Sequence, residues 1–213
     1  MSDTNEIDYE LMRPFGPCIG DFTMPGFLID SLNAFVDETV ADKIKSGELD
    51  HSGSLAGEVS QEIRVPPDVL KQGLGQYLLD ITGAYVGGVT GRQISKFQIL
   101  NSWIVRSFAG DFNPPHMHDG HISGAGYLMV PDQITNETAS RKADGNGGFI
   151  NFHYGTAQFA SDGLFAGKPK LGHVFVFPNY LSHSVNPFQG EGERRSFSFN
   201  ALIDDEIYDI YRL

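Results

Sequence analysis

The chain has 213 residues, of which 40% are apolar and 20% are charged, and its formal net charge is −12. This length and balance are typical of an ordinary globular domain and exclude collagen-like and intrinsically disordered chains. The acidic excess argues against nucleic-acid binding, which relies on Lys and Arg displacing counterions from phosphates. We therefore expect one folded domain, residues 1–213, that does not bind nucleic acid.

The single cysteine, Cys18, allows no intrachain disulfide, so the fold does not require an oxidising compartment. The first ten residues are polar and acidic, whereas a secretory signal begins with basic residues and an apolar run. No later segment has the length and apolar character of a membrane-spanning helix. These features predict a cytoplasmic protein without a membrane partner.

Residues 1–90 carry helical patterns. From Phe27 to Lys45, apolar residues recur at steps of three and four, the spacing of one helical face. A second helix is predicted after Pro66 and Pro67, because proline is favoured in the first turn. Gly83 and the following Gly87-Gly88 pair are predicted to end it.

From residue 91 onward, runs rich in Phe, Ile, Val and Tyr alternate with clusters of Gly, Pro and Asn, a pattern typical of strands. Strands are predicted at Lys96–Phe108, His121–Val130, Gly148–His153, His173–Phe177 and Arg194–Leu202. Short strands without intervening helices predict a mainly β sandwich or barrel with the two helices on one outer face.

Three segments between and after these strands are less regular. Two long loops, 131–147 and 155–171, are candidate active-site lids because they exceed the usual length of connections in a compact domain. The tail 204–213 is predicted as either a last helical turn or an edge strand.

A dense group of histidines is the strongest chemical signal in the sequence. His116, His118 and His121 fall within six residues. In an extended segment, alternate side chains point to the same side, so His116 and His118 would converge on one metal. Asp119 would face away, unless Gly120 bends the chain and brings its carboxylate round. The carboxylate therefore stays an open alternative, and His121 has the wrong parity.

A further histidine, His183, follows a buried strand pattern and a Pro-Asn turn, which would aim its imidazole back at the interior. Neutral imidazole binds iron, zinc, copper and nickel, so the histidines alone do not identify the metal. His51, His153 and His173 carry no motif and receive no role.

A candidate anion site follows at Arg194. The segment Arg194–Asn200 is predicted to form a hairpin strand that returns beside the His183 strand, with Arg194, Ser196, Ser198 and Asn200 on one face. A guanidinium grips a carboxylate through two parallel hydrogen bonds, and the Ser196 hydroxyl can extend that contact. The alternative is an exposed charge on an edge strand.

These features together resemble the 2-oxoglutarate and iron(II)-dependent oxygenase superfamily, specifically the small bacterial and phage oxygenases related to prolyl hydroxylases. The resemblance covers about half of the chain, and it is carried by Asn113-Pro114-Pro115-His116-Met117-His118, Ser123–Leu128, Phe177–His183 and Arg194–Asn200. It implies a double-stranded β-helix, or jelly roll, in residues 91–213, with the N-terminal helices packed outside.

The resemblance also implies a reaction and a set of site residues. His116 matches the first ligand of the superfamily's His-x-Asp/Glu motif and His183 the distal ligand, while His118 stands where a carboxylate is usual. Arg194, with Ser196 beside it, matches the residue that binds the far carboxylate of 2-oxoglutarate, and Tyr127 is a third candidate for that site. The implied activity is a dioxygenase that uses Fe(II), 2-oxoglutarate and molecular oxygen to hydroxylate an unidentified small molecule or peptide.

Two other functions remain open. A cupin-like metalloprotein would keep the histidines without 2-oxoglutarate and give Arg194 no role. A non-catalytic jelly-roll interaction domain would bind no redox metal. Trp103, Phe152 and Tyr127 are candidates for the pocket wall, although strand aromatics more often belong to the core. A two-fold homodimer is expected only because it is the commonest assembly.

Overall fold

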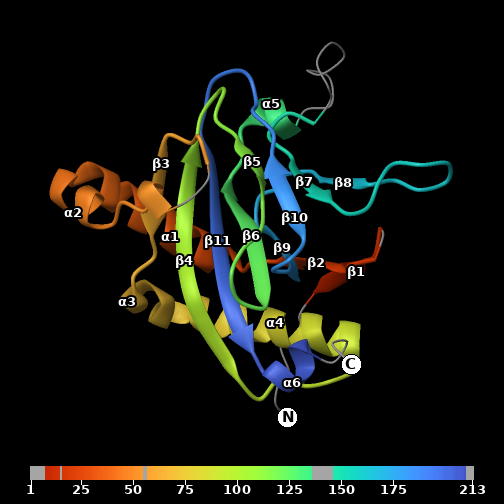
Figure 1. The fold of residues 1–213 in the computed structure, drawn as a ribbon. Helices are drawn as coiled ribbons and strands as arrows, with labels where there is room; N and C mark the ends of the chain where they lie inside the picture. Colours follow the sequence, from red (N-terminus) through yellow and green to blue (C-terminus); the bar gives the residue numbers. More distant parts are fainter. Residues whose placement is uncertain (1–7, 15, 55–56, 136–145, 210–213) are drawn as a thin grey trace.

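The computed structural model describes residues 8–14, 16–54, 57–135 and 146–209 (Figure 1). Its elements in chain order are β1 Tyr9–Met12, β2 Ile19–Thr23, α1 Gly26–Ala41, α2 Lys43–Glu48, η1 Ser52–Ser54, β3 Gln61–Arg64, α3 Pro67–Val69, η2 Leu70–Leu74, α4 Gly75–Thr90, β4 Phe97–Ser107, β5 Asn113–His116, β6 Ile122–Met129, α5 Asp132–Thr135, β7 Ile150–His153, β8 Leu164–Gly167, β9 His173–Pro178, β10 Ser182–Val185, β11 Arg194–Ile203 and α6 Asp205–Tyr208.

The strands form two antiparallel sheets. The larger sheet has the order β1-β2-β9-β6-β11-β4-β3, and the smaller has the order β5-β10-β7-β8. From β4 onward the chain passes repeatedly from one sheet to the other, which is the connection pattern of a jelly roll. The predicted mainly β fold is therefore confirmed.

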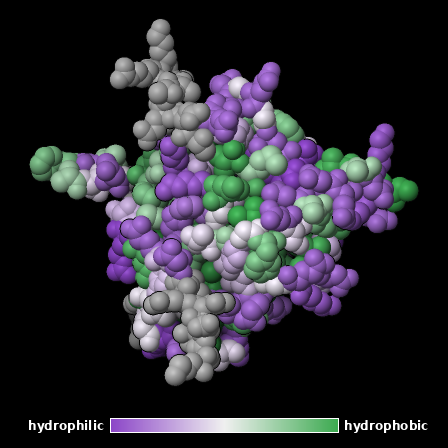
Figure 2. Space-filling model, turned by 180° about the vertical axis from the view of Figure 1, so that it is seen from behind, coloured by the Kyte–Doolittle hydropathy of each residue, from purple (hydrophilic) through white to green (hydrophobic). Residues whose placement is uncertain are grey.

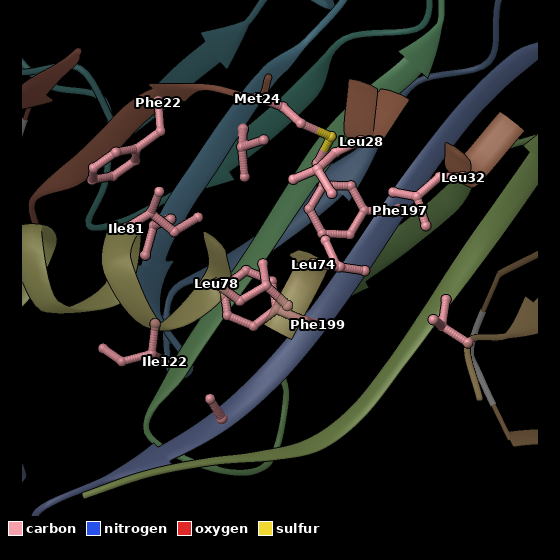
Figure 3. Packing of buried hydrophobic residues seen from close by; sticks show 14 of the residues in the cluster. Phe22, Met24, Leu28, Leu32, Leu74, Leu78, Ile81, Ile122, Phe197 and Phe199 are labelled. Atoms are coloured by element: carbon pink, nitrogen blue, oxygen red, sulfur yellow. The ribbon is translucent and has the colours of Figure 1, made fainter. Parts of the chain in front are cut away.

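One hydrophobic core lies between the larger sheet and the helices. Fully buried Phe197 and Phe199 of β11 point toward α4 and the turn before it, where Leu74 and Leu78 meet them (Figure 3). Leu28 of α1 belongs to the same cluster. The two predicted helices thus cover one outer face of the sheet, as the sequence pattern indicates.

A second core lies between the two sheets. It combines Tyr127 from the larger sheet with Ile150 and Phe152 from the smaller one, and Phe175 and Phe177 of β9 complete it. The rings meet mostly edge to face, for example Phe152 and Phe177 at 4.9 Å between centroids. This core fixes the spacing of the sheets beside the cavity described below.

The glycines of the second predicted helix do not end it. Helix α4 continues to Thr90, and Gly91 ends it in the left-handed region with φ of 71°. Gly88 serves packing instead, because a Cβ there would lie 2.5 Å from the side chain of Leu11 in β1. The predicted stop at Gly83 and Gly87-Gly88 was therefore wrong.

All five predicted strands are present, with ends shifted by one or two residues. The five predicted strands did not include six short ones, β1, β2, β3, β5, β8 and β10, of four or five residues each. For β5 and β10 the sequence predicted only an extended segment at His116 and a strand at His183, without bounds. The 155–171 loop contains β8 and the 131–147 loop begins with α5, while positions 136–145 of that loop lie outside the described residues. The tail forms the helical turn α6, and residues 210–213 lie outside the described part.

The predicted neighbour of β11 was wrong. This strand pairs with β4 and β6 in the larger sheet, whereas β10, which carries His183, pairs with β5 and β7 in the smaller sheet. The connection between them crosses from one sheet to the other instead of forming a hairpin. The polar face of β11 therefore looks across the cavity at the histidines.

Residues 154–163 connect β7 to β8 as an arm that projects from the body (Figure 1), and its far end is hydrophobic (Figure 2). Phe159 in this arm is fully exposed.

The N-terminal part of the chain, residues 1–90, supplies β1, β2 and β3 to the larger sheet as well as helices. The assignment of 1–213 to one domain stays a prediction. In the described part of the chain, no helix is long and apolar enough to cross a membrane.

Candidate active site

Three histidines converge at one end of the space between the sheets. His116 at the end of β5 and His183 in β10 are direct cross-strand partners, with ring centroids 4.4 Å apart. His118 lies two residues beyond β5, and its ring is 4.8 Å from that of His116 and 5.0 Å from that of His183. One ligand atom of each residue lies within 4.8 Å of the others, an arrangement that can hold a metal ion.

Backbone carbonyls orient two of the three imidazoles. Nδ1 of His116 lies 2.7 Å from the carbonyl oxygen of Pro114, and Nδ1 of His183 lies 3.0 Å from that of Leu181. At these distances Nδ1–H donates to the carbonyl and leaves the Nε2 lone pair free for a metal. The His118 ring instead meets Trp103 edge to face, at 5.6 Å between centroids.

Two of these histidines are held in their neutral form. Burial, with a smaller contribution from the nearby His116, lowers the pKa of His118 to about 4. The same causes, in the same order, lower the pKa of His183 to about 3. Since a metal ligand must present an unprotonated nitrogen, both rings are ready to bind a cation at neutral pH.

The two remaining groups of the histidine-rich segment lie outside this cluster. Asp119 is exposed and borders the cavity mouth, and its carboxylate is not part of the group of three. His121 turns toward α6, where its ring stacks on Tyr208 at 4.0 Å. The imidazoles of His116, His118 and His183 are therefore the donor set that the described residues bring together.

A cavity of about 320 Å³ extends from the histidines between the sheets. Arg194 lines it and is 2% exposed. Its Nη1 donates to the carbonyl of Gly148 at 2.8 Å and its Nη2 to the Ser107 hydroxyl at 3.0 Å. Among the described residues, no acceptor meets its Nε and no carboxylate forms an ion pair with it. The buried guanidinium thus has spare capacity for an anion.

The other predicted cosubstrate residues lie on the same wall. Ser196 of β11 and Tyr127 of β6 are cross-strand partners, and both line the cavity. Burial raises the pKa of the Tyr127 hydroxyl, so it stays protonated and can donate a hydrogen bond. Trp103 also lines the cavity, whereas the ring of Phe152 fills the core between the sheets, which is the more common place for a strand aromatic.

Sequence reasoning placed Asn200 on the polar face of β11 but missed its two partners, Ser123 and Asn101, of which Asn101 also lines the cavity. The Ser123 hydroxyl donates to Oδ1 of Asn200, and Nδ2 of Asn200 donates to Oδ1 of Asn101, both at 2.8 Å. Asn101 lies on the same face of β4 as Trp103, so the alternation of side chains along this strand could have indicated that it faces the cavity. His51 also borders the cavity, while His173 pairs with Asp21 and His153 lies 2.9 Å from the Ser184 hydroxyl.

This arrangement separates two kinds of chemistry within one cavity. Neutral imidazole donors suit iron, zinc, copper or nickel. The orphaned Nε of Arg194 suits a carboxylate, which would satisfy both its charge and its unused donor. The donor set and the guanidinium therefore fit a small carboxylate that reaches from the metal to Arg194.

Comparisons with known proteins agree with this chemistry. Residues 101–200 match the family model described as "Putative 2OG-Fe(II) oxygenase". No curated protein sequence matches the chain. Among solved structures, a Pseudomonas putida prolyl-4-hydroxylase is 17% identical with a TM-score of 0.55, and the alignment covers 87% of this chain and 91% of that one.

Two further structures have the same fold. A Trichoplax adhaerens prolyl hydroxylase, solved with a hypoxia inducible factor peptide fragment, is 12% identical with a TM-score of 0.59, covering 92% of this chain and 87% of that one. HygX from Streptomyces hygroscopicus, solved with nickel, 2-oxoglutarate and hygromycin B, is 13% identical with a TM-score of 0.54, covering 86% and 82%. At these identities the likeness shows the fold alone.

Proposed function

We propose that the chain is a 2-oxoglutarate and Fe(II)-dependent oxygenase, since residues 101–200 match the model of that family. In this proposal His116, His118 and His183 hold the iron, while Arg194, Ser196 and Tyr127 hold the cosubstrate. The observation that carries this proposal is the pairing of a three-histidine cluster with a buried, incompletely bonded arginine in one cavity.

The ligand set is supported by how the strands place it. His116 and His183 face each other from paired strands, so the sheet itself fixes their separation. His118 takes the position at which the superfamily usually has a carboxylate. With three neutral ligands, the metal keeps its full positive charge. A doubly negative cosubstrate would bring one negative charge to the metal and the other to Arg194.

The cosubstrate assignment is supported by the buried end of the cavity. Arg194 is the cation at that end, and its two Nη atoms are already fixed by Gly148 and Ser107. Such fixing orients the guanidinium before the ligand arrives, which reduces the entropy lost on binding. The Tyr127 hydroxyl and the Ser196 hydroxyl lie on the same wall and can add hydrogen bonds to a carboxylate.

When bound, iron with 2-oxoglutarate and oxygen supplies the oxidising power for hydroxylation of a C–H bond. The residues of the chain bind and orient the partners of that reaction. Trp103, Ile150 and Val185 limit the access of water by lining the cavity with apolar surface. We place the substrate on the solvent-facing side of the cavity, where Asn101 and Asp119 are exposed and His51 is partly exposed.

The substrate itself is unidentified, and both a peptide and a small molecule fit the proposal. One structural neighbour was solved with a peptide fragment and another with hygromycin B. A cytoplasmic location, a homodimer and the absence of nucleic-acid binding stay predictions from the sequence.

The test is an anaerobic titration of the Fe(II)-loaded protein with 2-oxoglutarate, following the visible metal-to-ligand charge-transfer band. We expect the band in the wild type, and Arg194→Met should need far more cosubstrate to produce it. Iron binding without a band would favour the cupin-like metalloprotein. A wild type that binds no iron would favour the non-catalytic interaction domain.

A further inference from the structure

The histidine that departs from the usual ligand pattern is also the one that lies off the strands. We infer that Asn179 and Tyr208 position His118 at the metal, so that the C-terminal helix α6 is part of the support of the metal site. The inference rests on the proposed function, in which His118 is a ligand. Neither Asn179 nor Tyr208 lines the cavity, so both act through His118.

The three ligands differ in how they are held. His116 and His183 belong to paired strands, and their rings bond to the backbone carbonyls of Pro114 and Leu181. Among the described residues, no hydrogen bond is formed by the ring of His118, which packs against Trp103. The direction of this imidazole therefore depends on its own backbone more than that of the other two.

Asn179 holds that backbone at two points. The backbone N–H of His118 donates to the carbonyl of Asn179 at 3.2 Å, and Nδ2 of Asn179 donates to the carbonyl of His118 at 3.0 Å. The backbone N–H of Asn179 also donates to the carbonyl of His121 at 3.1 Å. Asn179, the residue directly after β9, thus closes the loop that follows β5.

Tyr208 in α6 fixes the Asn179 side chain in turn. The Tyr208 hydroxyl donates to Oδ1 of Asn179 at 2.7 Å, so the amide must present Nδ2 to His118. The Tyr208 ring stacks on His121 at 4.0 Å with an interplanar angle of 12°. Helix α6 therefore contacts the ligand loop both through this ring and through the amide.

His121 ties the same loop to the end of β11. Its backbone N–H donates to the carbonyl of Ala201 at 2.9 Å, and its Nδ1 accepts from the backbone N–H of Ile203 at 3.2 Å. The loop is consequently held from β9, β11 and α6. Loss of one contact should loosen His118 without unfolding the sheets.

The experiment measures Co(II) affinity and the Co(II) visible spectrum of the full chain, without 2-oxoglutarate. Asn179→Ala removes the amide but keeps the backbone bonds, and Tyr208→Phe removes only the hydroxyl while keeping the stacked ring. We expect each change to weaken Co(II) binding about tenfold, as for other groups that orient metal ligands, and to alter the spectrum. Should Asn179→Ala fail to fold, Tyr208→Phe carries the test alone.

The matched control is Arg92→Ala, which removes another contact to α6, the 3.3 Å bond to the carbonyl of Glu206, without touching Asn179. Its Co(II) affinity should equal that of the wild type. In a His118→Ala background, Asn179→Ala should cause no further loss, because the residue through which it acts is gone.

Two outcomes would overturn the inference in different ways. If His118→Ala weakens Co(II) binding but Asn179→Ala and Tyr208→Phe bind like the wild type, the support role is wrong and the proposed ligand set stands. If His118→Ala itself binds Co(II) like the wild type, His118 is not a ligand, and the ligand set and the inference fail together.

Discussion

The two faces of β11 differ in the residues that they present and in what those residues contact. Toward the helices, the strand presents Phe197 and Phe199, both fully buried in the main core. Toward the smaller sheet, it presents Arg194, Ser196 and other polar residues, which line the cavity. The strand therefore contributes to the hydrophobic core with one face and lines the cavity with the other.

This difference teaches that burial alone does not reveal a residue's role in this strand. Arg194 is nearly as buried as Phe199, yet its environment leaves a charged group incompletely bonded, which costs free energy in an apolar interior. A residue that is kept at such a cost is a candidate for binding. The two faces should consequently respond to substitution in opposite ways.

The largest effect is expected on the helix-facing side. Phe199→Ala removes a fully buried ring and should lower the free energy of unfolding by about 3 to 5 kcal/mol. Urea denaturation would measure this loss. The protein that remains folded should still bind 2-oxoglutarate with an affinity close to that of the wild type, and a large loss of that affinity would break the comparison.

On the cavity-facing side, Arg194→Met should weaken cosubstrate binding while leaving the stability of the protein largely unchanged. It should raise the Kd for 2-oxoglutarate about 100-fold, equivalent to about 2.7 kcal/mol, because it removes the charged partner of the carboxylate. Thermal unfolding in the absence of cosubstrate should show an unchanged or higher Tm, since a buried cation without a counterion is replaced by an apolar chain. A marked fall in Tm would mean that Arg194 is structural.

Glu62 in β3 can be compared with Arg194, because it is a second buried, ionisable side chain with polar atoms that lack a hydrogen-bond partner among the described residues. It is 1% exposed, lies opposite Val105, and neither of its carboxylate oxygens meets a partner among the described residues. Burial, with a smaller contribution from Asp50, raises its pKa to about 7 from 4.5. The unfolded state therefore ionises first, and stability falls as pH rises from about 4.5 through 7.

The corresponding variant is Glu62→Gln, which cannot ionise. Its advantage in unfolding free energy over the wild type should be on the order of 2 kcal/mol above pH 7 and should shrink as the pH falls toward 4.5. Urea denaturation of both proteins across this pH range measures the difference. A difference that does not change with pH would show that the pKa of Glu62 is the same in the folded and unfolded states.

The smallest effect is expected from Ser196→Ala. Loss of one neutral hydrogen bond should raise the Kd for 2-oxoglutarate about fivefold, equivalent to about 1 kcal/mol. Ser198→Ala is the matched control, since it removes the next hydroxyl on the same face of β11. If both changes leave the Kd unaltered, the wall of hydroxyl groups does not contact the cosubstrate.

Local patterns in the sequence were sufficient to predict the long elements of the fold. Alternation over ten or eleven residues predicted β4 and β11, and a recurring apolar face predicted α1. The missed strands are four or five residues long, and pairing with distant segments stabilises them, so little of their signal is local. Gly88 of α4 misled the prediction of the helix end, because its close packing against Leu11 of β1 depends on the tertiary structure.

The candidate site shows the same limit. The density of histidines and the alternation around Arg194 predicted which side chains share a face, but not which sheet each strand joins. Asn179 carried no signal, because its importance arises from bonds to His118 and Tyr208, residues 61 and 29 positions away in the chain. A residue that positions another residue can be recognised only once the fold shows the contact between them.

His116 and His183 are direct cross-strand partners, whereas His118 lies in the loop after β5. A substitution at either paired position must fit the strand register, while a substitution at position 118 need only fit the loop. In the proposed ligand set, position 118 is therefore the one at which the charge of the site can be changed without altering the sheet that holds the other two ligands.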